Sequence, residues 1–215
     1  ETRPIPDIPL GSAPIWSGWR KLASLSPDLG LEGTVLFLDV DIVITDNIDP
    51  LFDYKPGHFC IIENWTQPGQ GVGNSSVYRS EAGNHTDIYD HFCEHHEQIY
   101  RDYSNEQTYL TKMVAANHPV KWWPESWCRS FKRHSVPIWP LRFIQKPTLP
   151  NDTRILVFHG PPKPIDAAKG KWQKDGGKRG KFIHPAPWIL DHWTDDQNQP
   201  AGTTKSREDQ KRKIS

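Results

Sequence analysis

The sequence predicts an α/β fold built as one domain. Short apolar runs typical of β-strands alternate with segments whose apolar residues recur every three to four positions, as in helices. A length of 215 residues suits a single hydrophobic core. The 26 basic side chains balance the 26 acidic ones, which argues against a dedicated nucleic-acid-binding protein. The longest apolar run is far shorter than the ~20 residues that span a bilayer, so we expect no transmembrane segment.

The cysteines indicate the cellular compartment. The three cysteines, Cys60, Cys93 and Cys128, are widely spaced and match neither a disulfide framework nor a paired-cysteine zinc site. A reducing compartment is the default for such a chain, so we expect a cytoplasmic protein.

The first expected elements are an extended segment and an amphipathic helix. Residues 1–15 contain four prolines, which lack the amide donor that a central strand needs. Residues 16–26 place Trp16, Trp19 and Leu22 at helical spacing. We expect this helix to pack these side chains on the sheet.

The expected strands follow the helix. Residues 34–38 (TVLFL) form a continuous apolar run, which is typical of a strand covered on both faces in a parallel sheet. Further short strands are predicted at residues 58–63, 75–79, 120–123 and 154–158.

Two longer helices are expected between these strands. Residues 86–103 carry apolar side chains at helical spacing, with a histidine-rich polar side. A second helix follows, because Ser104 and Gln107 have the spacing of a capping box just before an apolar run that begins at Tyr109.

The last part of the chain has a different composition. Residues 169–181 combine six basic residues, one acidic residue and four glycines, which predicts a mobile loop. Residues 184–193 predict a short helix that returns to the body. Residues 194–215 have no aromatic side chain and much charge, so we expect a disordered tail and place the single domain at residues 1–193.

Two carboxylates end the first strand. Asp39 and Asp41 directly follow the apolar run at residues 34–38. Ligands of open α/β sheets bind beyond the carboxyl ends of strands, and paired acidic oxygens suit a hard divalent cation that holds a diphosphate. The alternative is a strand that simply leaves the core, with both carboxylates solvated or capping the next turn.

A second polar group follows the apolar strand at residues 154–158. His159 offers a neutral imidazole that could complete a metal site, and the Lys163 ammonium could bind a phosphate as a point charge. The alternative for His159 is a structural, hydrogen-bonding histidine.

Four segments combine these features in a fixed order. They are residues 36–52 (LFLDVDIVITDNIDPLF), 73–77 (GNSSV), 105–110 (NEQTYL) and 159–164 (HGPPKP). In this order they resemble the motifs of the glycogenin-like, family 8 retaining glycosyltransferases. The family motifs are a metal-binding segment, an Asn-Ser/Ala-Gly strand, an Asp-Gln-x-x-Leu helix start and a His-x-Gly-x-x-Lys-Pro element.

The resemblance implies a fold and a metal. The fold would be the GT-A nucleotide-diphospho-sugar transferase fold, a mixed and mostly parallel sheet flanked by helices. Asp39, Asp41 and His159 would bind Mn²⁺, or Mg²⁺. Two carboxylates with one imidazole suit manganese, whereas magnesium prefers oxygen alone.

The resemblance also implies the reaction and the residues that take part in it. The protein would be a metal-dependent glycosyltransferase that moves a sugar from a nucleotide diphosphate donor, a UDP-sugar, to a saccharide or other acceptor with retention. The residues implied in donor binding are Lys163, Gly160, Asn74 and Ser75, and those implied in catalysis are Glu106, Gln107 and Asn74.

One part of the family pattern is missing, and two other functions stay open. The family places a nucleotide-base unit ahead of its metal-binding strand, but 38 residues precede Asp39, so we expect an N-terminally truncated domain. One alternative is a non-catalytic carbohydrate- or metal-binding remnant of that fold. The other is a nucleotidyltransferase, which attacks at phosphorus; the element at residues 159–164 favours sugar transfer over it.

Overall fold

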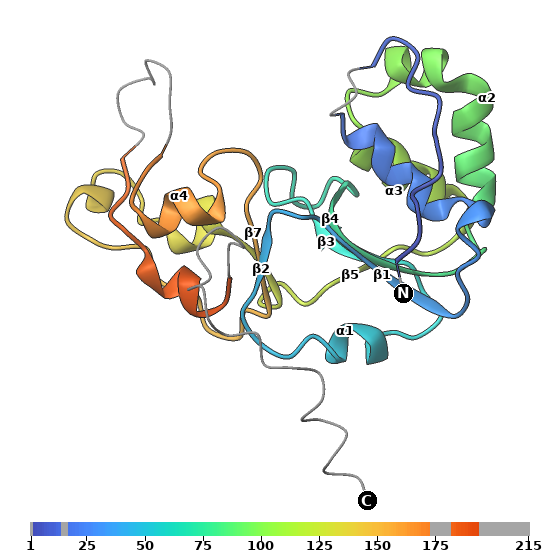
Figure 1. Cartoon of the computed structure of the whole chain (residues 1–215). Helices are drawn as coiled ribbons and strands as arrows, with labels where there is room; N and C mark the ends of the chain where they lie inside the picture. Colours follow the sequence, from blue (N-terminus) through green and yellow to red (C-terminus); the bar gives the residue numbers. More distant parts are fainter. Residues whose placement is uncertain (1, 14–16, 173–181, 194–215) are drawn as a thin grey trace, which may run out of the picture.

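The computed structural model describes residues 2–13, 17–172 and 182–193, which form two mixed β-sheets with helices packed around them (Figure 1). The larger sheet has strand order β1-β4-β3-β5 and the smaller one β2-β7-β6. This arrangement confirms the predicted α/β class. The strands are β1 Thr34–Leu38, β2 Ile42–Ile44, β3 Cys60–Glu63, β4 Gly73–Glu81, β5 Lys121–Trp122, β6 Cys128–Ser130 and β7 Ile155–Val157.

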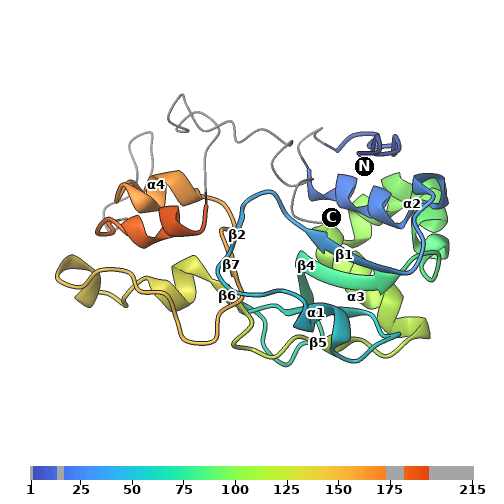
Figure 2. The ribbon, with the colours of Figure 1, turned by 60° about the horizontal axis from the view of Figure 1, so that its bottom comes forward.

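Helices cover the larger sheet unequally. One face carries α2 (Thr86–Asp102), α3 (Glu106–Asn117) and the 3₁₀-helix Gly18–Leu25, whereas the short α1 (Pro50–Asp53) lies on the other face (Figures 1 and 2). Neighbouring residues of β4 serve the two faces in turn, as the pleat of a strand requires. Tyr78 of β4 packs in the hydrophobic core under α2 and α3, and Val77 packs in a second core on the α1 face, so the two cores share this sheet.

Antiparallel pairing predominates, which corrects the expectation of a mostly parallel sheet. The pairs β1/β4, β3/β4 and β2/β7 are antiparallel, and within the described residues only β3/β5 and β6/β7 are parallel. In β1, Phe37 packs with the core under the helices and Leu36 with the core on the opposite face. A strand that packs on both faces is apolar throughout, whether it pairs in parallel or antiparallel. The apolar run therefore could not reveal how β1 pairs.

The chain crosses from the larger to the smaller sheet at Asp39 and Asp41. The Asp39 amide donates to the carbonyl of Ser76 in β4 over 2.9 Å, and the Phe158 amide donates to the Asp41 carbonyl over 3.1 Å. Strand β2 then pairs with β7 through Ile42 and Val157. The crossing places the two carboxylates at the junction of the sheets, next to the end of β7.

The smaller sheet has its own core. Buried side chains of β2 and β7 pack there with α4 (Pro164–Ala168) and with the 3₁₀-helix Pro187–Asp191, which is the short helix expected within residues 184–193. A π-helical turn at Phe131–Ser135 and a 3₁₀-turn at Leu141–Phe143 follow β6.

The predicted capping box of α3 is wrong. Asn105 is the N-cap, and its Oδ1 accepts a hydrogen bond of 3.0 Å from the Thr108 amide. The sequence predicts Ser104 in this position with Gln107 as its partner. Asparagine caps a helix at least as well as serine, so the residue nearer the helix takes the position.

The N-terminal helix packs more on other helices than the sequence predicts. Trp16 lies outside the described residues. The Trp19 indole is 7% exposed, and its ring centroid lies 5.4 Å from that of Phe92 in α2 and 6.0 Å from that of Tyr109 in α3. The helix therefore joins α2 and α3 as much as it covers the sheet.

Two sequence expectations fall outside the described residues. They concern most of the basic loop, at residues 173–181, and the tail at residues 194–215. In the part of the chain that is described, no helix combines the length and apolarity needed to cross a bilayer.

Candidate functional site

Pairing of β2 with β7 brings together two motifs that are far apart in the sequence. The Lys163 Nζ lies 2.5 Å from the Asp41 Oδ2. The two residues are 122 positions apart. The Lys163 side chain is 51% exposed, so its ammonium is free to turn toward another anion at this surface. The structure thus places the predicted donor-binding lysine beside the predicted metal-binding carboxylate.

His159 lies on the same side of the junction in a largely buried setting. Its Nε2 lies 2.7 Å from the Ser130 Oγ, and its ring stacks on Trp65 with the centroids 5.8 Å apart. Burial, together with the positive charges of Lys132 and Arg133, lowers the pKa of His159 to about 4. The imidazole is therefore neutral at physiological pH.

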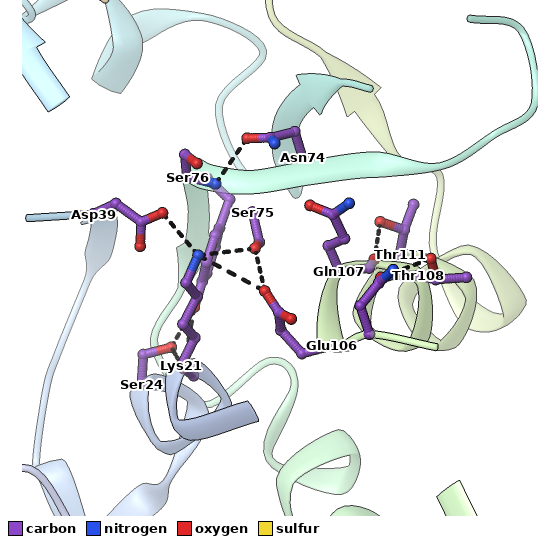
Figure 3. A network of polar contacts seen from close by, with 12 residues as sticks. Lys21, Ser24, Asp39, Asn74, Ser75, Ser76, Glu106, Gln107, Thr108 and Thr111 are labelled. Atoms are coloured by element: carbon purple, nitrogen blue, oxygen red, sulfur yellow. Dashed lines mark hydrogen bonds and ion pairs between the residues drawn. The ribbon is translucent and has the colours of Figure 1, made fainter. Parts of the chain in front are cut away.

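A second polar cluster lies at the end of β1 (Figure 3). The Lys21 Nζ lies 2.7 Å from the Asp39 Oδ2 and 3.7 Å from the Glu106 Oε1, and it donates to the Ser75 Oγ over 3.2 Å. The Ser75 hydroxyl donates in turn to the Glu106 Oε1 over 2.9 Å. One ammonium thus joins three of the four segments that carry the predicted site.

Local backbone features position Glu106. It is the first residue of α3, and a Cβ on Gly18 would lie 2.4 Å from its Oε2. Only glycine leaves room for the carboxylate there. At the same edge, the Gly73 amide of β4 donates to the Thr111 Oγ1 of α3 over 3.0 Å, and a Cβ on Gly73 would lie 2.6 Å from Ile61. The helix is therefore seated closely against β4.

Asn74 and Gln107 flank this cluster from β4 and α3 (Figure 3). The Asn74 Oδ1 accepts a hydrogen bond of 3.1 Å from the Ser76 amide. The Gln107 carbonyl accepts one of 2.7 Å from the Thr111 hydroxyl. The structure therefore groups Asn74, Glu106 and Gln107 around one corner of the sheet.

The predicted donor-binding glycine, Gly160, lies in a turn between His159 and Lys163. Its φ of +69° is in the left-handed region that favours glycine. A Cβ on Gly160 would lie 3.6 Å from the Lys132 Nζ, so a second ammonium stands over this turn. Together with Lys21 and Lys163, the junction holds three ammonium groups.

The predicted metal ligands suit a cation by their chemistry but are not assembled around one. Two carboxylates and a neutral imidazole fit manganese. Asp39 and Asp41 are each paired with a lysine, however, and His159 contacts Ser130. Across residues 2–13, 17–172 and 182–193, no three His, Cys, Asp or Glu side chains lie close enough together to hold a metal ion.

A cavity adjoins the junction at Trp65. Its volume is about 450 Å³, and its lining includes Glu63, Trp123, Glu125 and His134. The Trp65 indole forms part of this lining and also stacks on His159. The Trp65 ring therefore lies between the cavity and His159.

Three residues of the site carry no motif that predicts them. Lys21 could have been found as a lysine on the polar side of the first helix, opposite Trp19. Trp65 lies two residues after the end of β3, and Ser130 ends β6, but neither position has a sequence pattern that marks it as functional. Their roles arise from contacts between segments distant in the sequence.

The arrangement defines an α/β protein with a cluster of charged side chains where two sheets meet. No family model and no curated protein matches the sequence. Among solved structures, the chain is similar to the glycosyltransferase GlyE of Streptococcus pneumoniae TIGR4. The TM-score is 0.52 at 18% identity, over 76% of this chain and 41% of that one.

The apo form of GlyE gives a TM-score of 0.50 at 17% identity, over 79% of this chain and 42% of that one. The chain therefore has the predicted GT-A fold. It spans less than half the length of the GlyE chain.

Proposed function

We propose that the protein transfers a sugar from a nucleotide diphosphate donor, a UDP-sugar, to a saccharide acceptor with retention of configuration. The observation that carries this proposal is the junction of the sheets, where Lys21 pairs with Asp39, Lys163 pairs with Asp41 and the Lys132 ammonium lies beside the Gly160 turn, on a fold similar to that of a glycosyltransferase. Such a set suits a diphosphate, whose negative charge grows as it leaves the sugar.

Lys163 and Lys132 would hold the donor diphosphate. Each ammonium is a compact positive charge; Lys132 lies beside Gly160, and Lys163 follows the same turn and pairs with Asp41. The exposed Lys163 would exchange Asp41 for a phosphate oxygen when the donor binds. Positive charge fixed there before the reaction stabilises the leaving group without further rearrangement.

Glu106 would act at the sugar. Glycosyl transfer passes through a transition state with positive charge on the sugar ring, which a nearby carboxylate stabilises. Lys21 and Ser75 fix the Glu106 carboxylate, and Asn74 and Gln107 supply amide groups for sugar hydroxyls. A carboxylate and an amide close to the anomeric carbon are compatible with retention.

A divalent metal is the second part of the proposal. Asp39, Asp41 and His159 would hold Mn²⁺ once the two lysines release the carboxylates and the three side chains move closer together than they lie in the described residues. The ion would supply additional positive charge to the leaving diphosphate.

The cavity next to Trp65 would take the acceptor. Saccharides stack their apolar faces on aromatic rings and offer hydroxyls to carboxylates. Trp65 and Trp123 provide the rings, and Glu63 and Glu125 provide the carboxylates. Because Trp65 also contacts His159, an acceptor in this cavity would lie beside the bound donor.

The test is the release of nucleoside diphosphate from a panel of nucleotide sugars, with Mn²⁺ and a mixture of mono- and oligosaccharide acceptors. We expect turnover with a UDP-sugar, and a loss of at least about tenfold in Lys163→Ala. Lys169→Ala is the matched control, because Lys169 is exposed at the far end of α4.

The same assay separates the other functions. Donor binding without release of nucleoside diphosphate would overturn the proposal in favour of a binding module. Release of pyrophosphate from nucleoside triphosphates would overturn it in favour of nucleotidyl transfer.

A further inference from the structure

Exposed apolar side chains concentrate in one short segment that the site does not use. Of the twelve large hydrophobic side chains exposed in the described residues, five lie within positions 138–144. Ile138, Trp139 and Ile144 are 73%, 68% and 77% exposed. We call Ile138, Trp139, Leu141, Phe143 and Ile144 the apolar tip. A contiguous apolar patch of this kind on a protein surface marks an interaction site.

The backbone holds the apolar tip away from the core. The 3₁₀-turn Leu141–Phe143 is closed by hydrogen bonds from the Phe143 amide to the Pro140 carbonyl over 3.1 Å and from the Ile144 amide to the Leu141 carbonyl over 3.0 Å. Phe143 stacks on Phe182 with the ring centroids 5.5 Å apart, which fixes the base of the turn. The segment lies at the end of the molecule opposite α2 and α3 (Figures 1 and 2). It therefore projects as an ordered element and is accessible to a flat surface.

The chain segment that carries the apolar tip has basic side chains and no acidic ones. Between Glu125 and Asp152 the sequence contains five Lys or Arg residues and no acidic residue. Lys146 is exposed directly after the tip. The Arg142 guanidinium lies 5.8 Å from the centre of the Trp172 ring, at the side of the turn. Exposed Trp, Phe and Ile next to basic side chains are typical of elements that lie in the headgroup region of a bilayer.

We propose that the apolar tip docks the protein on the surface of an anionic lipid bilayer. Ile138, Trp139 and Ile144 enter the boundary between headgroups and acyl chains, and Lys146 lies against the lipid phosphates. The contact is peripheral, because a turn of this length buries only its own side chains. It needs no nucleotide or sugar, so it is independent of the proposed function.

The test is co-sedimentation of the full chain with phosphatidylcholine vesicles, with and without phosphatidylglycerol. The key variant is Ile138→Ser combined with Ile144→Ser, and Lys146→Glu tests the charge. Ile5→Ser is the matched control, because Ile5 is 70% exposed but distant in the sequence. Every variant keeps the remaining basic segments, so a difference between variants reports the tip alone.

We expect the wild type and Ile5→Ser to bind the anionic vesicles equally. The double variant should bind at least about tenfold more weakly, because each isoleucine contributes the burial of several carbon atoms. Lys146→Glu should also bind the anionic vesicles more weakly than the wild type does. Circular dichroism should show that the double variant keeps the wild-type fold. If the double variant is misfolded, Trp139→Ser takes its place in the test.

Two results would overturn the proposal. One is binding to the anionic vesicles that is equal in the wild type and the double variant, or that is absent from both. The other is a dimer of the wild type, seen by light scattering without vesicles, that the double variant loses while neither protein binds lipid; a second copy of the chain would then cover the tip.

Discussion

Lys21 is the single side chain on which most of the polar site depends. Its ammonium contacts Asp39 just after β1, Ser75 in β4 and Glu106 in α3. Without this ammonium, the part-buried carboxylates of Asp39 and Glu106 would repel each other and draw in water. Lys21 therefore fixes the position of the Glu106 carboxylate and also balances the charge of that carboxylate.

Replacing Lys21 with methionine should leave a similar hydrocarbon chain without the charge. We expect glycosyl transfer to fall at least about tenfold and the free energy of unfolding to fall by roughly 1 to 3 kcal/mol. Arg20→Met is the control, because Arg20 is the exposed neighbour on the same turn. Assays of transfer and thermal melts check both effects, and equal values for the two variants would contradict this role of Lys21.

His85 should make stability depend on pH. It is 5% exposed, and burial, followed by the nearby His118, lowers its pKa below the ordinary value of 6.5. The folded protein thus binds fewer protons here than the unfolded chain, so stability is full above pH 6.5 and declines as the pH falls below it.

Denaturant unfolding at several pH values measures this dependence. We expect His85→Gln to flatten the decline below pH 6.5 that the wild type shows. His192→Gln is an exposed control and should leave the curve unchanged. Identical curves for wild type and His85→Gln would exclude His85 as the cause.

At the scale of elements, the N-terminal 3₁₀-helix is held mainly by one indole. Trp19 stacks on Phe92 and contacts Tyr109, which ties Gly18–Leu25 to α2 and α3. The same short helix presents Lys21 to the site on its other side. Packing of the indole and placement of the ammonium are therefore coupled through eight residues.

Trp19→Ala should lower the free energy of unfolding by about 3 to 5 kcal/mol, because a large buried ring leaves a cavity. Trp139→Ala makes the same chemical change at a ring that is 68% exposed, and we expect about 0.5 kcal/mol or less there. Urea melts compare the two variants. A similar loss in both would show that Trp19 does not anchor the helix.

Elements with strong local patterns could be predicted from the sequence, and those formed by distant pairing could not. Strand Thr34–Leu38 occurs with its predicted bounds because its five residues are all apolar or β-branched. Strand Cys128–Ser130 has a central arginine and no apolar pattern, and it exists through parallel pairing with β7. Sequence motifs mark Asp41 and Lys163 as candidates, whereas Lys21 and Trp65 reach the candidate site only through tertiary contacts.

At the scale of the whole molecule, the two sheets meet where the metal is proposed to bind. Added Mn²⁺ should raise the melting temperature of the wild type, and the rise should grow with metal concentration as linkage requires. Asp41→Asn should respond more weakly, because it loses one of the proposed ligands. Equal melting curves for the two proteins across the titration would contradict a metal site at Asp41.

The site as a whole is proposed to bind a nucleoside diphosphate through its ammonium groups. Lys163 faces solvent and pairs with Asp41, which places it at the mouth of the junction. Losing one charge-assisted contact to a phosphate weakens binding by about 1.5 to 3 kcal/mol, or roughly 10- to 150-fold. The same loss at Lys169 should have no effect.

Calorimetric titration of UDP into the protein with Mn²⁺ present is the most direct test of this binding. We expect measurable binding by the wild type and by Lys169→Ala, and binding at least about tenfold weaker by Lys163→Ala. No heat of binding in the wild type, or equal affinity in all three proteins, would contradict a nucleotide diphosphate site at the junction of the two sheets.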